Sequence, residues 1–111
     1  MVEPGSQPIV VLITFPSLDE ANRVAAVLVD EHLAACVNLV TGVRSVFFWE
    51  GAREEAAEIL ALVKTTRQHF GDLAARVKSL HSYSVPEMIA LPILGGYEPY
   101  LTWLTETVSK R

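Results

Sequence analysis

Two long strand-like segments in the middle of the chain constrain its fold most. They cover Cys36–Glu50 and Ala56–Thr66, with the polar run Gly51–Glu55 between them. In both segments, successive side chains are expected to point to opposite faces, with the period of two that is typical of a β-strand. Gly42 interrupts the first segment and predicts a bulge or bend there. The two segments therefore predict a long antiparallel hairpin with a turn at residues 51–55.

A strand and a helix are expected before this hairpin. The run Pro8–Phe15 is continuously apolar and β-branched, which is typical of a strand buried on both faces. Ser17 and Glu20 have the spacing of a capping box, in which each side chain satisfies a free backbone donor of the first helical turn. Apolar residues at helical spacing then extend the predicted helix to about His32.

The same order repeats after the hairpin. Thr65 and Gln68 form a second capping-box pattern, and a second amphipathic helix is predicted to end near Leu80. The apolar segment Glu87–Leu94 predicts a last strand. Because Pro92 has no backbone N–H to donate, this strand is expected to lie at a sheet edge or to end there. A third amphipathic helix closes the chain.

The resulting order, β-α-β-β-α-β followed by a helix, is that of an α+β ferredoxin-like sandwich. With 111 residues, one domain is expected, at residues 8–111 after a disordered tail at residues 1–7. The helices of this fold cover one sheet face only. An apolar face carrying aromatic residues is rarely left to water, so a homo-oligomer that packs the sheets together is expected.

Composition excludes several classes of function. The net charge of −4 is unlike that of a nucleic-acid-binding protein. No apolar run reaches the roughly 18 residues of a membrane helix, and no signal peptide is recognisable. A single cysteine forms no internal disulfide, so the reducing cytoplasm is the expected location. The chain is not expected to be an enzyme, because it contains no nucleophile elbow, P-loop or dinucleotide fingerprint.

Cys36 and His81 are the candidate metal ligands. Cys36 is either a small buried hydrophobe or a soft ligand for copper or another thiophilic metal. His81 opens a loop that also carries Tyr83 and Glu87, which makes it the best ligand candidate among three histidines. None of the histidines forms a short metal-binding pair, and there is no Cys-x-x-Cys motif.

Other residues have both a structural and a functional interpretation. Lys64 is either a lysine that extends along apolar surface to water, or a counter-charge to Glu87 or to an anionic ligand. Trp49 and Trp103 either pack in the core or line a pocket at a subunit interface. A further group of charged residues is interpreted as a solvated hairpin tip rather than a cation site: Arg53, Glu54, Glu55 and Glu58.

From about Ile9 to Val108, the chain resembles the CutA family of divalent-cation tolerance proteins. Five motifs in order carry the resemblance, namely Leu33-Ala-Ala-Cys-Val-Asn38, Trp49-Glu-Gly51, Lys64-Thr-Thr66, Val85-Pro-Glu87 and Tyr100-Leu-Thr-Trp103. There are two departures from the family pattern. Ser82 stands where the family usually has proline, and Phe15-Pro16 stands where some members have a second cysteine.

The resemblance implies a homotrimer similar in architecture to PII signalling proteins, joined through the hairpin at residues 43–66. It implies a link to copper, with Cys36 and His81 at the matching positions. The positions of an inter-subunit cleft are matched by Lys64, Tyr83, Glu87 and Trp103, to which we add Trp49.

Three functions are consistent with this sequence. The first is a trimeric tolerance protein that binds copper (Cu²⁺) or another divalent cation. The second is a PII-like signalling module that binds a small anionic ligand in the inter-subunit cleft through Lys64. The third is a stable scaffold that recruits another protein. The first is favoured because of the family resemblance.

Overall fold

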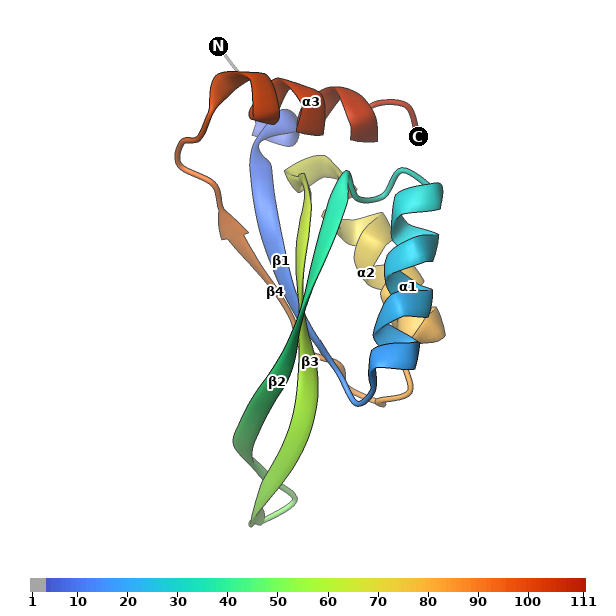
Figure 1. Ribbon diagram of the computed structural model, residues 1–111, viewed down its shortest axis with the longest axis vertical. Coiled ribbons are helices and arrows are strands. Elements are labelled where there is room, and N and C mark those ends of the chain that lie inside the picture. Colours follow the sequence, from blue (N-terminus) through green and yellow to red (C-terminus); the bar gives the residue numbers. More distant parts are fainter. Residues whose placement is uncertain (1–3) are drawn as a thin grey trace.

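The structure is a computed structural model that describes residues 4–111. A four-stranded antiparallel sheet has the strand order β2-β3-β1-β4, with α1 and α2 beside it and α3 across one end (Figure 1). The elements are β1 (Pro8–Phe15), α1 (Leu18–Asp30), β2 (Cys36–Trp49), β3 (Ala52–Thr66), α2 (Phe70–Leu80), β4 (Met88–Pro92) and α3 (Glu98–Val108). The predicted ferredoxin-like fold with an extra terminal helix is confirmed, and β4 lies at the expected edge.

The main core lies between the sheet and the helices α1 and α2. Alternate residues of β1 fill its sheet side, and the helices contribute their apolar stripes. The largest contributors are Val11, Ile13, Phe15, Val24, Leu28, Leu73 and Val77. Within residues 4–111, no helix is long and apolar enough to cross a membrane.

The opposite sheet face, here called the open face, is not covered by α1 or α2. It carries the intervening side chains of the strands, because successive residues of a strand point to opposite faces. They are Val10, Leu12, Leu60, Leu62, Ile89 and Leu91, all of them half-buried or exposed. The sequence predicted that β1 is buried on both faces. A single chain covers only one of them.

The hairpin of β2 and β3 is longer at its tip than predicted. The ladder continues to the pair Trp49 and Ala52, and the turn consists of Glu50 and Gly51 alone. Both turn residues have positive φ angles, of 49° and 81°, as a two-residue type I′ turn requires. The predicted turn at residues 51–55 is therefore wrong. Gly51 lets the chain reverse within two residues, so residues 52–55 stay in the strand.

The predicted interruption of β2 is confirmed. The register of the β2–β3 ladder shifts between Val40 and Val43, which marks a β-bulge. Gly42 lies within the bulge at a φ of 78°, a conformation that a side chain would strain. The bulge determines which β2 residues beyond it share the open face.

The two predicted capping boxes have different outcomes. The Ser17 hydroxyl accepts a hydrogen bond from the Glu20 N–H at 3.2 Å and caps α1 as expected. The Glu20 carboxylate, however, bonds the distant Ser82 N–H instead of completing the box. The second box is wrong, because the Thr65 hydroxyl is buried and donates to the Leu33 carbonyl at 2.7 Å.

The N-terminal segment differs from the predicted disordered tail. Residues 1–3 lie outside the described residues, and Pro4–Ser6 forms one 3-10 turn. The Gln7 side chain donates to the Ile93 carbonyl at 2.9 Å, and the Gln7 carbonyl accepts from the Arg67 N–H at 2.9 Å. These bonds attach residues 4–7 to the ordered domain.

Candidate functional site

The predicted site residues lie in two groups at opposite ends of the sheet. In the sheet, Lys64 of β3 lies opposite Cys36 of β2 on one side and opposite Val10 of β1 on the other. His81 bonds the carbonyl of Thr14, four residues further along β1. Four strand residues span roughly 13 Å. We call the region around Cys36, Lys64 and α3 the α3 end, and the region around the loop at residues 81–87 the hairpin end.

Cys36 at the α3 end is a half-buried thiol at the start of β2. Its sulfur lies 3.8 Å from the Asn38 side-chain oxygen, a weak hydrogen bond. The pKa of the Tyr100 phenol is raised, mainly by burial and in addition by the neighbouring Cys36. The Tyr100 ring lies 5.5 Å from that of Trp103. The thiol is thus bordered by polar and aromatic groups of β2 and α3.

Lys64 is half-buried on the open face at the same end. No carboxylate lies within ion-pair distance of it among residues 4–111. Glu87 precedes Met88, which pairs with Ile13, so Glu87 belongs to the hairpin end. The interpretation of Lys64 as the counter-charge of Glu87 therefore does not hold within one chain.

His81 is the centre of a hydrogen-bond network at the hairpin end. Its Nε2 donates to the Thr14 carbonyl at 2.7 Å, and its Nδ1 accepts from the Tyr83 N–H at 3.0 Å. The ring stacks on Phe15 at a centroid distance of 4.7 Å. Both ring nitrogens are thus engaged in a fully buried side chain. His81 can bind a metal ion only if one of these bonds is broken.

Glu20 belongs to the same network and was not recognised in the sequence as a site residue. Its buried carboxylate accepts from the Ser82 N–H at 3.1 Å and lies 3.4 Å from His81 Nδ1. A proline at position 82, as in the family pattern, has no N–H and could not form this bond. Ser82 therefore replaces the rigidity of a proline ring with a hydrogen bond to α1.

Glu58 is the second buried carboxylate at this end. It accepts a 2.8 Å hydrogen bond from the Tyr83 hydroxyl and is only 7% exposed. The assignment of Glu58 to a solvated tip is therefore wrong. The β2–β3 register places it opposite Val43, at the base of the hairpin. The pKa of Tyr83 is raised to about 12, mainly by burial and in addition by this carboxylate.

The raised pKa of Tyr83 predicts a pH dependence. The folded state holds the phenolic proton more tightly than the unfolded chain, whose tyrosine pKa is 10.0. The contribution of Tyr83 to the free energy of unfolding is thus complete below pH 10 and is lost as the pH rises to about 12. Phenolate absorbance follows the titration of Tyr83. Glu58→Gln should lower the pKa of Tyr83, and an unchanged titration in that variant would contradict the role of Glu58.

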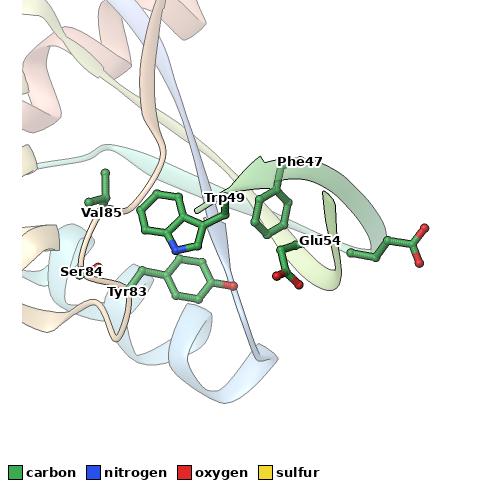
Figure 2. Close-up of a pocket in the computed structure, with 7 residues that line it drawn as sticks. Phe47, Trp49, Glu54, Tyr83, Ser84 and Val85 are labelled. Atoms are coloured by element: carbon green, nitrogen blue, oxygen red, sulfur yellow. The ribbon is translucent and has the colours of Figure 1, made fainter. Parts of the chain in front are cut away.

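An aromatic pocket also lies at the hairpin end. It has a volume of about 360 Å³ and is lined by Phe47, Trp49, Glu54, Glu55, Tyr83, Ser84 and Val85. Figure 2 shows the rings of Trp49 and Tyr83 beside each other, with Phe47 and Glu54 coming from the hairpin. Glu58 and Glu87 line an adjoining cavity of about 440 Å³ that shares Trp49. The hairpin end therefore combines aromatic faces with carboxylates and is better suited to a cation than to an anion.

A complete metal site is not assembled by one chain. No three side chains of His, Cys, Asp or Glu converge as metal ligands among residues 4–111. Cys36 is the single thiol, and His81 lies at the other end of the sheet. A metal ion at either residue would therefore need ligands from water or from a second copy of the chain.

Comparisons with known proteins agree with this architecture. Residues 9–107 match the family described as CutA1 divalent ion tolerance protein. The chain is 54% identical over 97 residues to the divalent-cation tolerance protein CutA of Thermus thermophilus, covering 87% of this chain and 94% of the relative. It is 44% identical over 98 residues to the Archaeoglobus fulgidus protein of that name, covering 88% and 95%.

A solved structure gives the same result for the fold. The structure described as divalent cation tolerance protein (Cut A1) from Thermus thermophilus superimposes with a TM-score of 0.89 at 52% identity. The superposition covers 90% of this chain and 97% of that one. The resemblance seen in five sequence motifs is thus confirmed over most of the chain. The chain belongs to the CutA1 divalent ion tolerance protein family.

Proposed function

We propose that this protein is a homotrimeric divalent-cation tolerance protein that binds copper or another divalent cation. The observation that carries the proposal is the family match over residues 9–107, since the relatives are named for tolerance to divalent cations. The family name describes a tolerance and no reaction. We also propose the cytoplasm as its location, because the single cysteine forms no internal disulfide.

Two observations support the assembly. The open face exposes apolar side chains such as Ile89 and Leu91, which are 49% and 44% exposed in the single chain. A patch of this kind is commonly covered by another protein surface. In addition, Trp103 and Lys64 lie at one end of the sheet and Tyr83 at the other. A cleft formed by residues from both ends therefore requires a second copy, as in a PII-like trimer.

Cys36 is the proposed metal ligand within each subunit. A thiolate is the softest ligand that the chain offers, and soft ligands favour copper. Its half-buried position allows access without unfolding. His81, the second proposed ligand, would have to give up its bond to the Thr14 carbonyl or to the Tyr83 N–H. The geometry therefore supports Cys36 more than His81.

The experiment is a calorimetric titration of wild type and Cys36→Ser with Cu²⁺. We expect about one ion per chain in wild type and an affinity at least ~10-fold weaker in the variant, because a neutral hydroxyl is a weaker copper ligand than a thiolate. Zn²⁺ provides a control, because it binds thiolates without redox chemistry. Sedimentation should show the same mass for both proteins. Equal copper affinity in both would refute Cys36 as the ligand.

The alternative is a PII-like module that binds a small anionic ligand. Lys64 favours it, because this half-buried residue has no carboxylate partner among the described residues and is the ladder partner of Cys36. Titration with pyrophosphate distinguishes the two functions. Binding that is lost in Lys64→Gln and kept in Cys36→Ser would support the anion module. Absence of pyrophosphate binding, together with copper binding, would support the metal function.

A further inference from the structure

The helix α3 is attached to the rest of the subunit by a small core of its own. Its two buried side chains, Leu104 and Val108, form a cluster with Ala35 that is separate from the main core between the sheet and the helices. Ile93 packs against this cluster. An element with few buried apolar contacts opens more easily than the main core of a protein. Polar contacts therefore matter more for the docking of α3 than they do in the main core.

The last turn of α3 faces two histidines from other elements. Figure 1 shows this end of α3 above the connection between α1 and β2. In that connection, His32 Nδ1 donates to the Thr107 carbonyl at 3.0 Å, since a carbonyl can only accept. The carbonyl of the next residue, Val108, is near enough to the ring of His69, which precedes α2, to act on it as a hydrogen-bond acceptor. Two successive carbonyls at the end of α3 thus face two imidazole rings.

The surroundings of His69 are unfavourable to its protonated form. The residue is half-buried, and its Nδ1 lies 2.7 Å from the Thr66 hydroxyl of β3. The pKa of His69 is lowered, mainly by burial and in addition by the positive charge of Arg111. Asp72 of α2 and the Val108 carbonyl act in the opposite direction but do not compensate. The ring therefore binds a proton less tightly when α3 is docked than it does in water.

The position of Arg111 links this charge to α3. The Arg111 backbone N–H donates to the Val108 carbonyl at 3.3 Å, so Arg111 is attached to the end of the helix. The carboxylate of Glu31 has a lowered pKa, mainly because of its hydrogen bonds from Arg76 and in addition because of Arg111. Arg76 already binds both oxygens of Glu31, at 2.8 to 3.2 Å. Protonated His69 and Arg111 are thus like charges on the two sides of the contact between α3 and the rest of the subunit.

We propose that His69 is an acid-sensitive latch of α3, whose protonation favours release of residues 98–111 from the rest of the subunit. The released state binds the proton more tightly than the docked state. The contribution of His69 to docking is therefore complete above the ordinary histidine pKa of 6.5 and decreases as the pH falls through that value. Because α3 carries Tyr100 and Trp103, its release changes the surroundings of Cys36. The latch itself does not rest on copper binding.

Hydrogen exchange followed by mass spectrometry tests the latch on the intact assembled protein, in peptides that cover residues 98–111. The rates are corrected for the intrinsic pH dependence of amide exchange. We expect the protection of these peptides to be at least ~2-fold lower at about pH 5.5 than at about pH 7.5, because protection reports the population of the open state. Peptides from β1 and α1 serve as the internal reference and should change less. Equal protection of residues 98–111 at both pH values would overturn the proposal.

Matched variants identify the titrating group. His69→Gln keeps a polar side chain that stays neutral, so the pH dependence of protection should be lost. His69→Lys carries a positive charge at both pH values and should lower the protection at about pH 7.5. Arg111→Gln removes the like charge and should reduce the pH dependence. His32→Gln is the control at the same end of α3 and should keep it. An unchanged pH dependence in His69→Gln would contradict the assignment.

Discussion

Replacing His81 by alanine is expected to lower the free energy of unfolding by about 3 kcal/mol, even without metal. The change leaves the Thr14 carbonyl and the Tyr83 N–H without their partner. Each buried polar group left unsatisfied costs ~1–3 kcal/mol. The stacking on Phe15, worth ~1 kcal/mol, is also lost. Urea denaturation of wild type and variant in chelator, at one protein concentration, measures the difference.

His69→Ala is the control for this prediction. The His69 ring bonds the Thr66 hydroxyl, at 2.7 Å, in a partly exposed 3-10 turn. Its replacement is expected to cost no more than ~1.5 kcal/mol, the usual net value of one hydrogen bond. A metal-free His81→Ala protein as stable as wild type would contradict the structural role. If that variant lost only the stabilisation gained from added copper, His81 would be a ligand instead.

Leu62→Glu is expected to dissociate the assembly into single chains. Leu62 lies on the open face of β3, between Leu12 of β1 and Asn38 of β2. If copies cover this face, the new carboxylate is buried in each subunit without a counter-charge. The effective penalty is several kcal/mol per charge, and it is repeated in every copy. Sedimentation should therefore show the mass of one chain, with helical circular dichroism kept.

Leu18→Glu provides the control for dissociation. Leu18 is 44% exposed on α1, on the other side of the sheet. The same chemical change there should leave the sedimenting mass unchanged, because no subunit contact is proposed for that helix. An unchanged mass for Leu62→Glu would show that the open face is not the contact surface. The subunits would then have to meet elsewhere.

The fold could be predicted from sequence because its signals are local and periodic. The period of two in β3, the Ser17 cap and Gly42 each act within a few residues, and each is found as predicted. The errors have physical reasons as well. Thr65 has a capping pattern, but tertiary structure uses its hydroxyl to bond the Leu33 carbonyl. The turn was placed too late because Gly51 was not recognised as the second residue of a type I′ turn.

The candidate site was harder to predict, because its contacts join residues far apart in sequence. Glu20 bonds Ser82, 62 residues away, and Glu58 bonds Tyr83, 25 residues away. A carboxylate at capping-box spacing gives no sign that it faces a distant loop. The period of two within β3 does place Glu58 on the open face, but its burial depends on the contact with Tyr83 of a distant loop, which the sequence does not show.

Motif matching brought together residues that one chain keeps apart. Lys64 and Trp103 belong to the α3 end, whereas Trp49, Tyr83 and Glu87 belong to the hairpin end. Sequence motifs carry no information on which chain contributes each residue to a cleft. The proposed cleft with all five residues therefore requires more than one copy of the chain.

Native mass spectrometry of the copper-loaded protein tests the central claim most directly, because one spectrum counts both chains and metal ions. We expect a particle of three times the chain mass of 12.2 kDa that carries copper in wild type. For Cys36→Ser we expect the same particle without copper. A single-chain particle in wild type, or equal copper content in both proteins, would contradict a trimeric cation-binding protein with its ligand at Cys36.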